Sequence, residues 1–547
     1  MEVVPHANDP PAASFRPLPG AVTDDTAAGT RNVDVFYGPP VDQSWEWIGD
    51  PSGDRAFLIT STSWETLELW TTDGTAGGTV NLGRCDGAYT PPPSGTVAGG
   101  VLLFAGYDED HGVELWRSDG TPVGTHLVAD IASADFGGSN PHDFMTLGDS
   151  VLFFAGEGPA RYALWRSDGT EAGTTVVHGE MEGQSAWTAS ATRVFFLPTR
   201  SRESLWTSDG TEAGTVRLTP PGVRVYGSLS APVIKLGNRV FFSAWFPPSG
   251  IEPWVTDGTP QGTRMLADLN PGRGGSSPDD FTVFAGKAWL TALRHLWKSD
   301  GTAQGTVAIG PELQDLHPRT TYGGRLWFTG LNGAGSTELW ATDGTAARTG
   351  RFAALKTIES LTVHAGRLWF LGNGSELWST DGTVAGTRKA GLPASSFRLL
   401  LSDGARLYLT DSQPALWVSD GTTAGTRKIS DQGIQDGPWI AIAGRLYYAS
   451  SEGALYTSDG TVAGTRPARP DGEPRNAKTL LRFGDRLIAV TVLGSLWESD
   501  GTAEGTRWIR DISWNGSSRQ QIAKAGPRLF FPSWDAATGT ELWAIHE

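Results

Sequence analysis

The chain of 547 residues contains a single cysteine, Cys85, and only 19% charged residues. One cysteine excludes an intrachain disulfide and any zinc site built from cysteines. No apolar run approaches the ~20 residues of a membrane helix, so we expect no membrane span. The net charge of −17 argues against a nucleic-acid partner, because phosphate backbones bind basic surfaces. An aromatic content of 10% excludes a disordered chain.

Common catalytic signatures are also missing from the sequence. It contains no His-Glu-x-x-His zinc motif, no Gly-x-Ser-x-Gly elbow, no phosphate-binding loop and no Gly-x-Gly-x-x-Gly fingerprint. No reaction and no cofactor can be inferred from motifs, so we lean towards a protein that is not an enzyme. Residues 1–20 lack the basic start and apolar core of a signal peptide. This leaves either a cytoplasmic chain or a mature exported domain.

What the sequence does contain is one repeat. Residues 68–79 read ELWTTDGTAGGT, and the Leu-Trp and Asp-Gly-Thr parts recur along the chain. Later copies depart little from this pattern, with Tyr456 in place of Trp and Pro253 in place of Leu. The motif aspartates from the first full copy onwards are Asp73, Asp119, Asp168, Asp209, Asp257, Asp300, Asp343, Asp381, Asp420, Asp459 and Asp500.

The two ends of the chain complete the count. Residues 23–30 hold the second half of a unit, and residues 541–543 hold the first half. From Asp24 to Asp500 the motif takes eleven steps of about 43 residues each. A second element, an arginine or similar residue followed by aliphatic and aromatic residues as in residues 367–370 (RLWF), recurs twelve times. Both counts indicate twelve units, the last of them split between the termini.

Each unit reads as four short antiparallel strands. In residues 358–390 we expect strands at 360–364, 367–371 and 376–379, and a fourth from about 386. Asn373-Gly374 is a two-residue hairpin signal, because both positions tolerate positive φ. Counting back from that loop places Gly372 opposite Ser375 and Trp369 opposite Trp378. Four strands in ~40 residues are typical of one β-propeller blade.

We therefore predict an all-β fold: one β-propeller of about twelve four-stranded blades, closed by pairing of the N- and C-terminal segments. Residues 1–22 would be an N-terminal extension and residues 23–547 the single closed ring. The alternative is two six-bladed propellers, since the steps before Asp300 run longer than those after it. Independent rings would each need a closing strand, and no second split unit is present in the middle of the chain.

These strings resemble the ELWxxDGT repeat family of bacterial proteins, over nearly the whole chain from Thr23 to Trp543. Three linkers also resemble the family's Asp-Ile/Leu…Ser-x-Pro stretch, at residues 130–141, 268–278 and 511–513. The resemblance implies a propeller-like fold and an extracellular or cell-surface location. It implies no active site.

The Asp-Gly-Thr series invites a metal or catalytic interpretation, but a structural turn is favoured. Asp accepts hydrogen bonds from backbone amides two residues on, Gly supplies positive φ, and Thr caps more weakly. A feature needed in every blade is a turn rather than a unique site. Asp108 and Asp110, in a local acidic run, are the candidate ligands for a hard cation such as Ca²⁺, against the simpler alternative of a solvated loop.

Tryptophans outside the motif are the candidate ligand contacts, whereas motif tryptophans are expected to be buried between blades. Loops on one face of a propeller commonly carry binding. The candidates are Trp45, Trp47, Trp187, Trp245, Trp439, Trp514 and Trp534.

Three functions remain open. The favoured hypothesis is a non-catalytic binding or scaffold propeller that recognises a glycan or a protein surface, and we expect it to be a monomer. The second is a carbohydrate-active propeller hydrolase or lyase with its site in the irregular first units. The third is a purely structural ring.

Overall fold

The structure is a computed structural model. It describes residues 45–48, 55–63, 66–73, 78–85, 95–132, 138–156, 162–179, 181, 183–190, 192–198, 204–225, 234–390, 397–411, 413–434, 437–512, 523–525, 528–535 and 539–546. Within these ranges the chain forms strands, turns and one short 3-10 helix, η3 (Ala346–Arg348), and no α-helix. The prediction of an all-β fold is confirmed.

The chain divides into two compact units. Unit 1 comprises residues 1–194, 208–215 and 510–547, and unit 2 comprises residues 195–207 and 216–509. The division runs through the sheet made of β13 (Gly183–Ser190), β14 (Arg193–Pro198), β15 (Trp206–Ser208) and β16 (Val216–Arg217), and it also cuts the end of β45 (Arg507–Asp511).

Unit 1 contains three further sheets. The first holds β1 (Trp45–Ile48), β2 (Ala56–Ser63), β3 (Thr66–Thr72), β4 (Val80–Cys85), β5 (Gly95–Ala98), β6 (Val101–Asp108), β7 (Gly112–Ser118) and β8 (His126–Ala129). The second holds β9 (His142–Leu147), β10 (Ser150–Gly156), β11 (Tyr162–Ser167) and β12 (Thr175–His178). The third holds β46 (Ala523–Ala525), β47 (Arg528–Asp535) and β48 (Gly539–His546).

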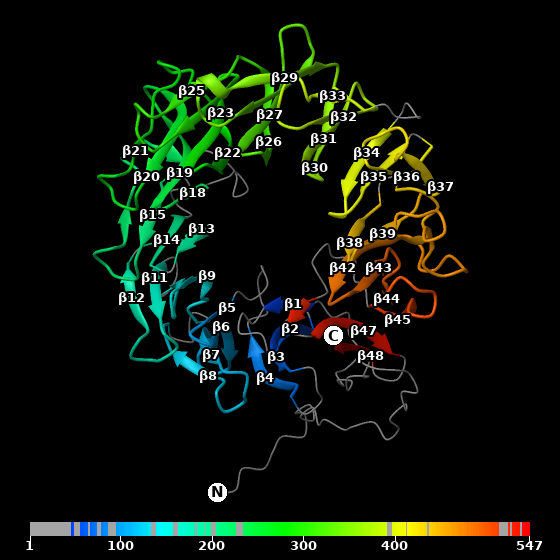
Figure 1. Ribbon diagram of the computed structural model, residues 1–547. Helices are drawn as coiled ribbons and strands as arrows, with labels where there is room; N and C mark the ends of the chain where they lie inside the picture. The colour runs from blue at the N-terminus through cyan, green and yellow to red at the C-terminus, as the bar shows by residue number, and fades with distance from the viewer. Residues whose placement is uncertain are drawn as a thin grey trace, which may run out of the picture. The chain divides into compact units, whose positions relative to one another are not determined.

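Unit 2 is a series of similar sheets (Figure 1). The first three hold β17 (Arg224–Val225), β18 (Ile234–Leu236), β19 (Arg239–Phe246), β20 (Gly250–Thr256) and β21 (Arg264–Met265); β22 (Asp279–Phe284), β23 (Lys287–Ala292), β24 (His295–Ser299) and β25 (Val307–Ile309); and β26 (Gln314–Tyr322), β27 (Arg325–Leu331), β28 (Thr337–Thr342) and β29 (Gly350–Leu355). The next two hold β30 (Ile358–His364), β31 (Arg367–Gly372), β32 (Glu376–Thr380) and β33 (Arg388–Lys389); and β34 (Phe397–Ser402), β35 (Leu407–Asp411), β36 (Leu416–Ser419) and β37 (Arg427–Ser430). The last two hold β38 (Trp439–Ile442), β39 (Arg445–Ala449), β40 (Leu455–Ser458) and β41 (Arg466–Pro467); and β42 (Ala477–Phe483), β43 (Arg486–Thr491), β44 (Ser495–Ser499) and β45 (Arg507–Asp511).

Most of these sheets are four-stranded antiparallel meanders whose spatial order follows the chain. The eight-stranded sheet of unit 1 consists of two such meanders, joined where β4 meets β6 by the single pair Cys85 and Gly106. This repeated module is the propeller-like architecture that the sequence period predicted.

The predicted hairpin register was wrong by one residue. Gly372 lies opposite Glu376, and Trp378 lies opposite Phe370, not Trp369. The loop therefore has three residues, closed by a hydrogen bond from the Ser375 amide to the Gly372 carbonyl (3.1 Å). Asn373 and Gly374 do adopt positive φ, as predicted. The actual register stacks the rings of Phe370 and Trp378, with centroids 6.3 Å apart.

The core lies between neighbouring sheets. Leu339 and Trp327, from one sheet of unit 2, pack with Leu368 and Phe370 from the next. Apolar side chains on both sheet faces are thereby removed from water, which is the main stabilising term. Each described motif leucine is fully buried, and Pro253 is buried in its place in one repeat. The expectation that the motif tryptophans are buried was wrong for most of them, because of those described only Trp70 and Trp254 are buried and the others are partly exposed.

First strands of successive sheets lie beside one another in unit 2, as β22, β26, β30 and β34 do, and as β38 and β42 do. Figure 1 shows β26, β30, β38 and β42 on the concave side of this unit. We call them inner strands. In an antiparallel meander, the turn between the third and fourth strands and the exit from the fourth strand lie at opposite ends of the sheet. One end therefore carries the Asp-Gly-Thr turn, and the other carries the linker that leads into the next inner strand.

Candidate functional site

The Asp-Gly-Thr turns are closed by their own side chains. Asp300 Oδ1 accepts hydrogen bonds from the amide (3.0 Å) and the hydroxyl (2.7 Å) of Thr302. The Thr302 hydroxyl oxygen in turn accepts from the Gly305 amide (2.9 Å). The same bonds from the following threonine recur at Asp119, Asp168, Asp209, Asp257, Asp343, Asp381, Asp420, Asp459 and Asp500. At Asp73 a Cβ on Gly78 would lie 1.9 Å from the carboxylate, the same close approach as in these turns.

Hydrogen bonds within the turn favour the ionised form of Asp168 and Asp300. The threonine hydroxyl, which donates to the charged form, lowers the pKa of Asp168 and of Asp300. Across the described residues no three histidine, cysteine or acidic side chains are grouped closely enough to hold a metal ion. The turn aspartates therefore serve the backbone in this structure.

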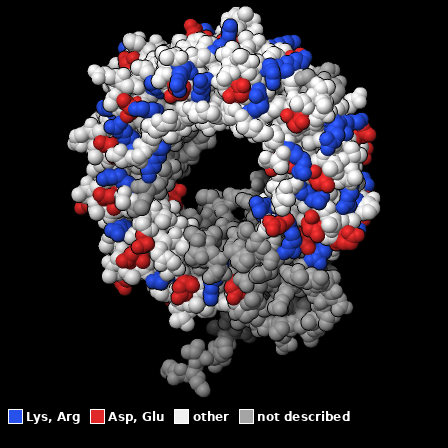
Figure 2. Space-filling model, in the orientation of Figure 1, with Lys and Arg blue, Asp and Glu red and all other residues white. Residues whose placement is uncertain are grey.

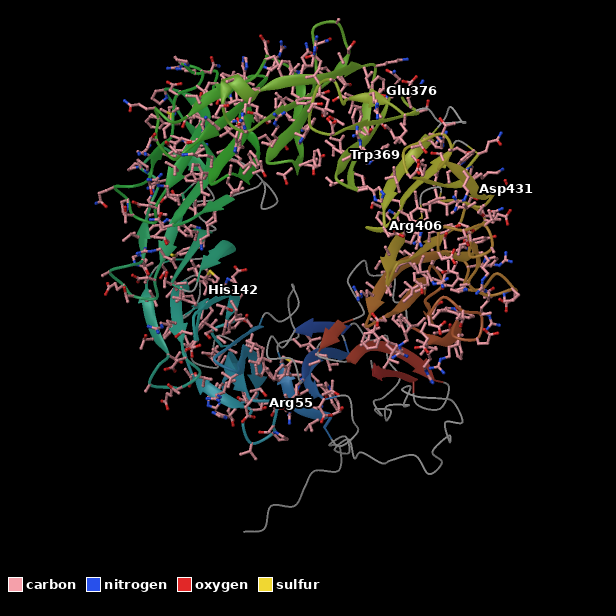
Figure 3. All side chains as sticks on the ribbon, viewed as in Figure 1. Arg55, His142, Trp369, Glu376, Arg406 and Asp431 are labelled. Carbon is pink, nitrogen blue, oxygen red and sulfur yellow. The ribbon has the colours of Figure 1, made fainter. Side chains whose placement is uncertain are left out.

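Basic side chains tie several of these turns to the neighbouring repeat. Arg239 Nη1 donates to the Asp300 carbonyl (2.5 Å), and Arg264 Nη2 donates to the Gly301 carbonyl (2.6 Å). Figure 3 labels a copy in unit 1, Arg55, whose guanidinium donates to the Gly120 carbonyl (2.7 Å). Further copies are Arg117 with Gly169, Lys298 with Gly344, Arg325 with Gly382 and Arg427 with Gly460. Arg55, Arg239 and Arg325 belong to the second repeated element, and their spacing alone did not reveal this role as inter-sheet ties.

A buried glutamate organises each of the two long linkers. Glu252 is fully buried and accepts from the amides of Leu269 (3.0 Å) and Asn270 (3.2 Å) and from the Ser276 hydroxyl (2.5 Å). Glu114 binds the linker of residues 130–141 in the same way. Burial raises the pKa of Glu252 although its hydrogen bonds oppose the shift. The similar sequences of these two linkers are therefore explained by the motif glutamate, which accepts hydrogen bonds from the linker residues.

The acidic run that holds the candidate cation ligands Asp108 and Asp110 closes a hairpin. Asp108 Oδ1 accepts from the amides of Asp110 (3.0 Å) and His111 (2.7 Å), and the His111 ring Nδ1 lies 2.9 Å away. Asp110 is exposed at the tip. The local hydrogen bonds fit a solvated loop.

The candidate tryptophans have separate locations. Trp45 and Trp47 lie on β1, Trp187 on β13 and Trp534 on β47, while Trp514 lies outside the described residues. Their side chains are not part of what the structure describes.

Two candidates have described side chains. Trp245 on β19 is half-buried beneath the guanidinium of Arg224, which lies 5.3 Å from the ring centroid. Trp439, the first residue of inner strand β38, is 40% exposed. Val283 of β22 and Val363 of β30 are also exposed, but Trp439 is the one exposed aromatic ring among the apolar side chains described on the inner strands.

Trp439 belongs to a row of exposed side chains on neighbouring inner strands. Arg398 of β34 and Lys478 of β42 are both exposed, one sheet to either side of it. Next to β34, strand β30 forms a hollow of about 240 Å³, lined by Ile358, Glu359, Ser360 and Leu361. We call Glu359, Ser360, Arg398, Trp439 and Lys478 the inner-strand row.

β-Bulges shape this row. Lys478 is the extra residue between the pairs Ala477–Thr491 and Thr479–Val490. Arg398 is the extra residue between Phe397–Asp411 and Leu399–Thr410. Bulges of this kind re-aim a side chain and are common beside functional sites. In β30 the bulge includes Ser360, whose φ is 53°.

Neighbouring inner strands of unit 2 have the opposite charge. Strands β22, β26 and β30 carry Asp279, Asp280, Asp315 and Glu359 against one arginine, Arg319. Asp280 Oδ2 lies 2.6 Å from the His317 ring nitrogen and joins β22 to β26. Elsewhere Figure 2 shows basic and acidic residues interspersed over the described surface. On these inner strands, by contrast, acidic residues gather on β22, β26 and β30 and basic residues on β34 and β42.

Unit 1 holds a second cluster of chemistry-bearing residues, at the start of β9. Figure 3 labels His142, whose ring meets Tyr162 edge-on with centroids 5.5 Å apart. Its Nε2 lies 4.0 Å from Asp143 Oδ2. Burial raises the pKa of Asp143, while the charge of His142 opposes that shift. These residues follow the long linker, in the irregular part of the chain.

Comparisons with known proteins assign no family. No protein-family model matches the chain, and no curated protein matches it. Solved structures that it resembles include the computationally designed Ika8 protein (9% identity, 67% of this chain and 98% of that one, TM-score 0.31) and BamB from Moraxella catarrhalis (12% identity, 60% and 97%, TM-score 0.32). The tricorn protease is another (10% identity, 91% of this chain and 56% of that chain, TM-score 0.26). Because these TM-scores are low, the description of the fold is based on the sheets described above and not on these similarities.

Proposed function

We propose that this chain is a non-catalytic binding protein that recognises a glycan through the inner-strand row of unit 2. The observation that supports the proposal best is the exposed Trp439, which offers a flat apolar face with polar and charged neighbours. Sugar rings are amphipathic in the same way, with apolar C–H faces and polar edges. A ring stacked on the indole would place its hydroxyls beside Arg398 and Lys478, which are hydrogen-bond donors.

We also propose the number of blades and the way in which the ring closes. Twelve blades in one ring, closed by residues near the two termini, would hold the inner strands at a common centre. The two six-bladed rings remain the alternative. We also propose an extracellular or cell-surface location and a monomer, and within the described residues no helix has the length and apolarity to cross a membrane.

The proposal is tested by replacing Trp439 with alanine. Trp508, on the outer strand β45, is 50% exposed and offers a matched control. We expect the glycan affinity of Trp439→Ala to fall by roughly 5- to 150-fold, because stacking on an exposed aromatic contributes about 1–3 kcal/mol in comparable ring systems. Trp508→Ala should bind as the parent does. Equal binding by both variants would contradict the proposal.

The cluster at His142 favours a second candidate function, a carbohydrate-active hydrolase or lyase. A half-buried carboxyl with a raised pKa beside an imidazole and a phenol is suited to general acid–base chemistry. Turnover of a chromogenic glycoside panel by the full chain, lost in Asp143→Asn, would support this function. Clean inactivity of the full chain would count against it.

A further inference from the structure

We infer that the inner-strand row binds a neutral, extended polysaccharide at two places. One sugar ring stacks on Trp439, and the hydroxyls of another sugar in the same chain donate to Glu359 in the hollow on β30. The inference rests on the proposed glycan-binding function and deepens it, because it names the substrate class and a second point of contact.

The hollow on β30 is opened by a bulge and anchored in the core. Ser360 and Leu361 lie in the bulge, where the partner strand has the single residue Phe370. Ser360 has a φ of 53°, a backbone conformation that side chains other than glycine rarely adopt and that often marks a functional site. Ile358 is buried in the cluster between two sheets, and Leu361 packs against the same cluster. The apolar side of the hollow is therefore held by rigid elements.

Glu359 supplies the hollow with an acceptor that has no partner of its own. Its side chain is exposed, and among the described residues its carboxylate takes part in no hydrogen bond or ion pair. The Ser360 hydroxyl beside it is likewise without a described partner. Asp280 of β22, by contrast, lies 2.6 Å from the ring nitrogen of His317. Glu359 is thus the carboxylate of these strands that is open to a ligand in a hollow.

The register of the strands places Glu359 near the level of Arg398 and Trp439 on the next two sheets. Level is counted from the arginine at or just before the start of the second strand in each sheet, namely Arg367, Arg406 and Arg445. Glu359 lies opposite the fourth residue after that arginine and Trp439 opposite the third, while Arg398 lies in a bulge between the fourth and the fifth. At about 3.4 Å per residue, the three positions differ by at most ~7 Å along the strands.

Packing holds the three sheets in succession. Strands β30 and β34 lie side by side, and Leu401 of β34 shares a buried cluster with Leu446 of β39, the strand that pairs with β38. Packed sheets lie about 10 Å apart, so two steps separate Glu359 from Trp439 by ~20 Å. A disaccharide is too short to reach both side chains, whereas an extended chain of several sugars can contact both.

The chemistry of the row favours an uncharged chain. A carboxylate only accepts hydrogen bonds and a guanidinium only donates them, whereas a sugar hydroxyl does both. One neutral chain can therefore donate to Glu359, accept from Arg398 and stack on Trp439. An anionic chain would meet a like charge at Glu359, and a cationic chain would meet one at Arg398, so the row disfavours both.

The test measures binding of five polymers to the full chain by calorimetry: the neutral chains laminarin, galactomannan and dextran, the anionic polygalacturonate and the cationic chitosan. Glu359→Ala is compared with Glu504→Ala, since Glu504 is exposed in an outer turn of the same unit. We expect Glu359→Ala to bind the neutral chain about tenfold more weakly, which equals about 1.4 kcal/mol. Glu504→Ala should bind as the parent does, and thermal melts should show that both variants fold.

A second measurement uses a disaccharide and an octasaccharide prepared from the neutral chain that binds. In the parent the octasaccharide should bind more tightly, because its second contact forms within the complex. In Glu359→Ala the disaccharide should bind as it does to the parent, and the advantage of the octasaccharide should shrink about tenfold, again about 1.4 kcal/mol. A defect in folding would weaken both fragments alike.

Tighter binding of polygalacturonate or chitosan than of every neutral chain would overturn the neutral class. Unchanged binding by Glu359→Ala, or equal affinity of the parent for the two fragments, would overturn the second contact. If Trp439→Ala still weakens binding in either case, the proposed glycan function stands by itself. Failure of all five polymers to bind would overturn both proposals.

Discussion

At the scale of single residues, the repeat is specified by close contacts that tolerate no extra atom. A Cβ on Gly305 would lie 2.1 Å from the Asp300 carboxylate, and one on Gly421 would lie 1.8 Å from the ring of Trp369. The glycines of the repeat are therefore needed both for the turn geometry and to leave space for the neighbouring Asp and Trp side chains. The sequence predicted these residues to form a turn. It could not predict the contact of Gly421 with Trp369, because the two residues belong to different repeats.

We predict that Gly305→Ala destabilises the protein by about 1–3 kcal/mol, because the new methyl group forces the Asp300 carboxylate out of its turn. The matched control is Gly333→Ala, since a Cβ there meets no atom within 4 Å. Urea unfolding of the two variants measures the difference. Equal stability of Gly305→Ala and the parent would contradict the close approach.

The buried glutamates give a second prediction at this scale. Glu252→Ala leaves two amides and one hydroxyl of the linker without their acceptor, so we expect a loss of about 2–4 kcal/mol in unfolding free energy. Hydrogen exchange should show faster exchange at Leu269 and Asn270 than in the parent. Unchanged protection of these amides would show that the carboxylate does not hold the linker.

At the scale of strands and sheets, the period and strand type were predictable, but the exact pairing was not. Alternating residues and turn signals indicate four strands per unit, and the structure has them. The register of β31 and β32 depended on whether Ser375 belongs to the loop or to the strand. Sequence cannot decide that, because the choice is made by its hydrogen bond to Gly372 and by the contact of Phe370 with Trp378.

The inter-sheet ties were also beyond local reasoning, since each joins residues of different repeats. We predict that Arg239→Met lowers the unfolding free energy by about 1 kcal/mol, because the Asp300 carbonyl loses a charged donor in a partly exposed place. Arg388→Met, on an exposed outer strand, should have little effect. Thermal melts of the two variants check this, and equal melting temperatures would remove the tie from the account.

At the scale of the whole molecule, the turn aspartates act together on pH stability. The folded state lowers the pKa of Asp119, Asp168, Asp257, Asp300 and Asp459, chiefly through the threonine hydroxyl. Each contributes stability that is present above its unfolded pKa of about 3.9 and is lost as the pH falls through the folded value. We therefore expect stability to decline steeply below about pH 4.

The buried Glu114 and Glu252 act with the opposite sign. Their raised pKa means that their contribution is complete below the unfolded value and is lost as the pH rises through the folded value. Urea unfolding at a series of pH values separates the two effects. In the variant Asp300→Asn, the unfolding free energy should fall less steeply as the pH is lowered below about 4. The same fall as in the parent would contradict the role of the turns.

The proposed ring closure is a further property of the whole molecule. Deletion of residues 1–33 should lower the melting temperature, because the last blade would lose a strand and expose its edge. Residues 1–44 lie outside the described part of the chain, so this expectation comes from the split repeat alone. A truncated chain that melts no lower than the full chain would contradict closure by the termini.

Glycan recognition is the central claim, and a glycan array tests it most directly. The full chain and Trp439→Ala would be screened side by side, in calcium and again in EDTA. The account predicts selective binding of glycans by the full chain, retained in EDTA and lost in Trp439→Ala. A blank array in both conditions would contradict it, and loss of binding in EDTA would return the carboxylate turns to consideration as metal sites.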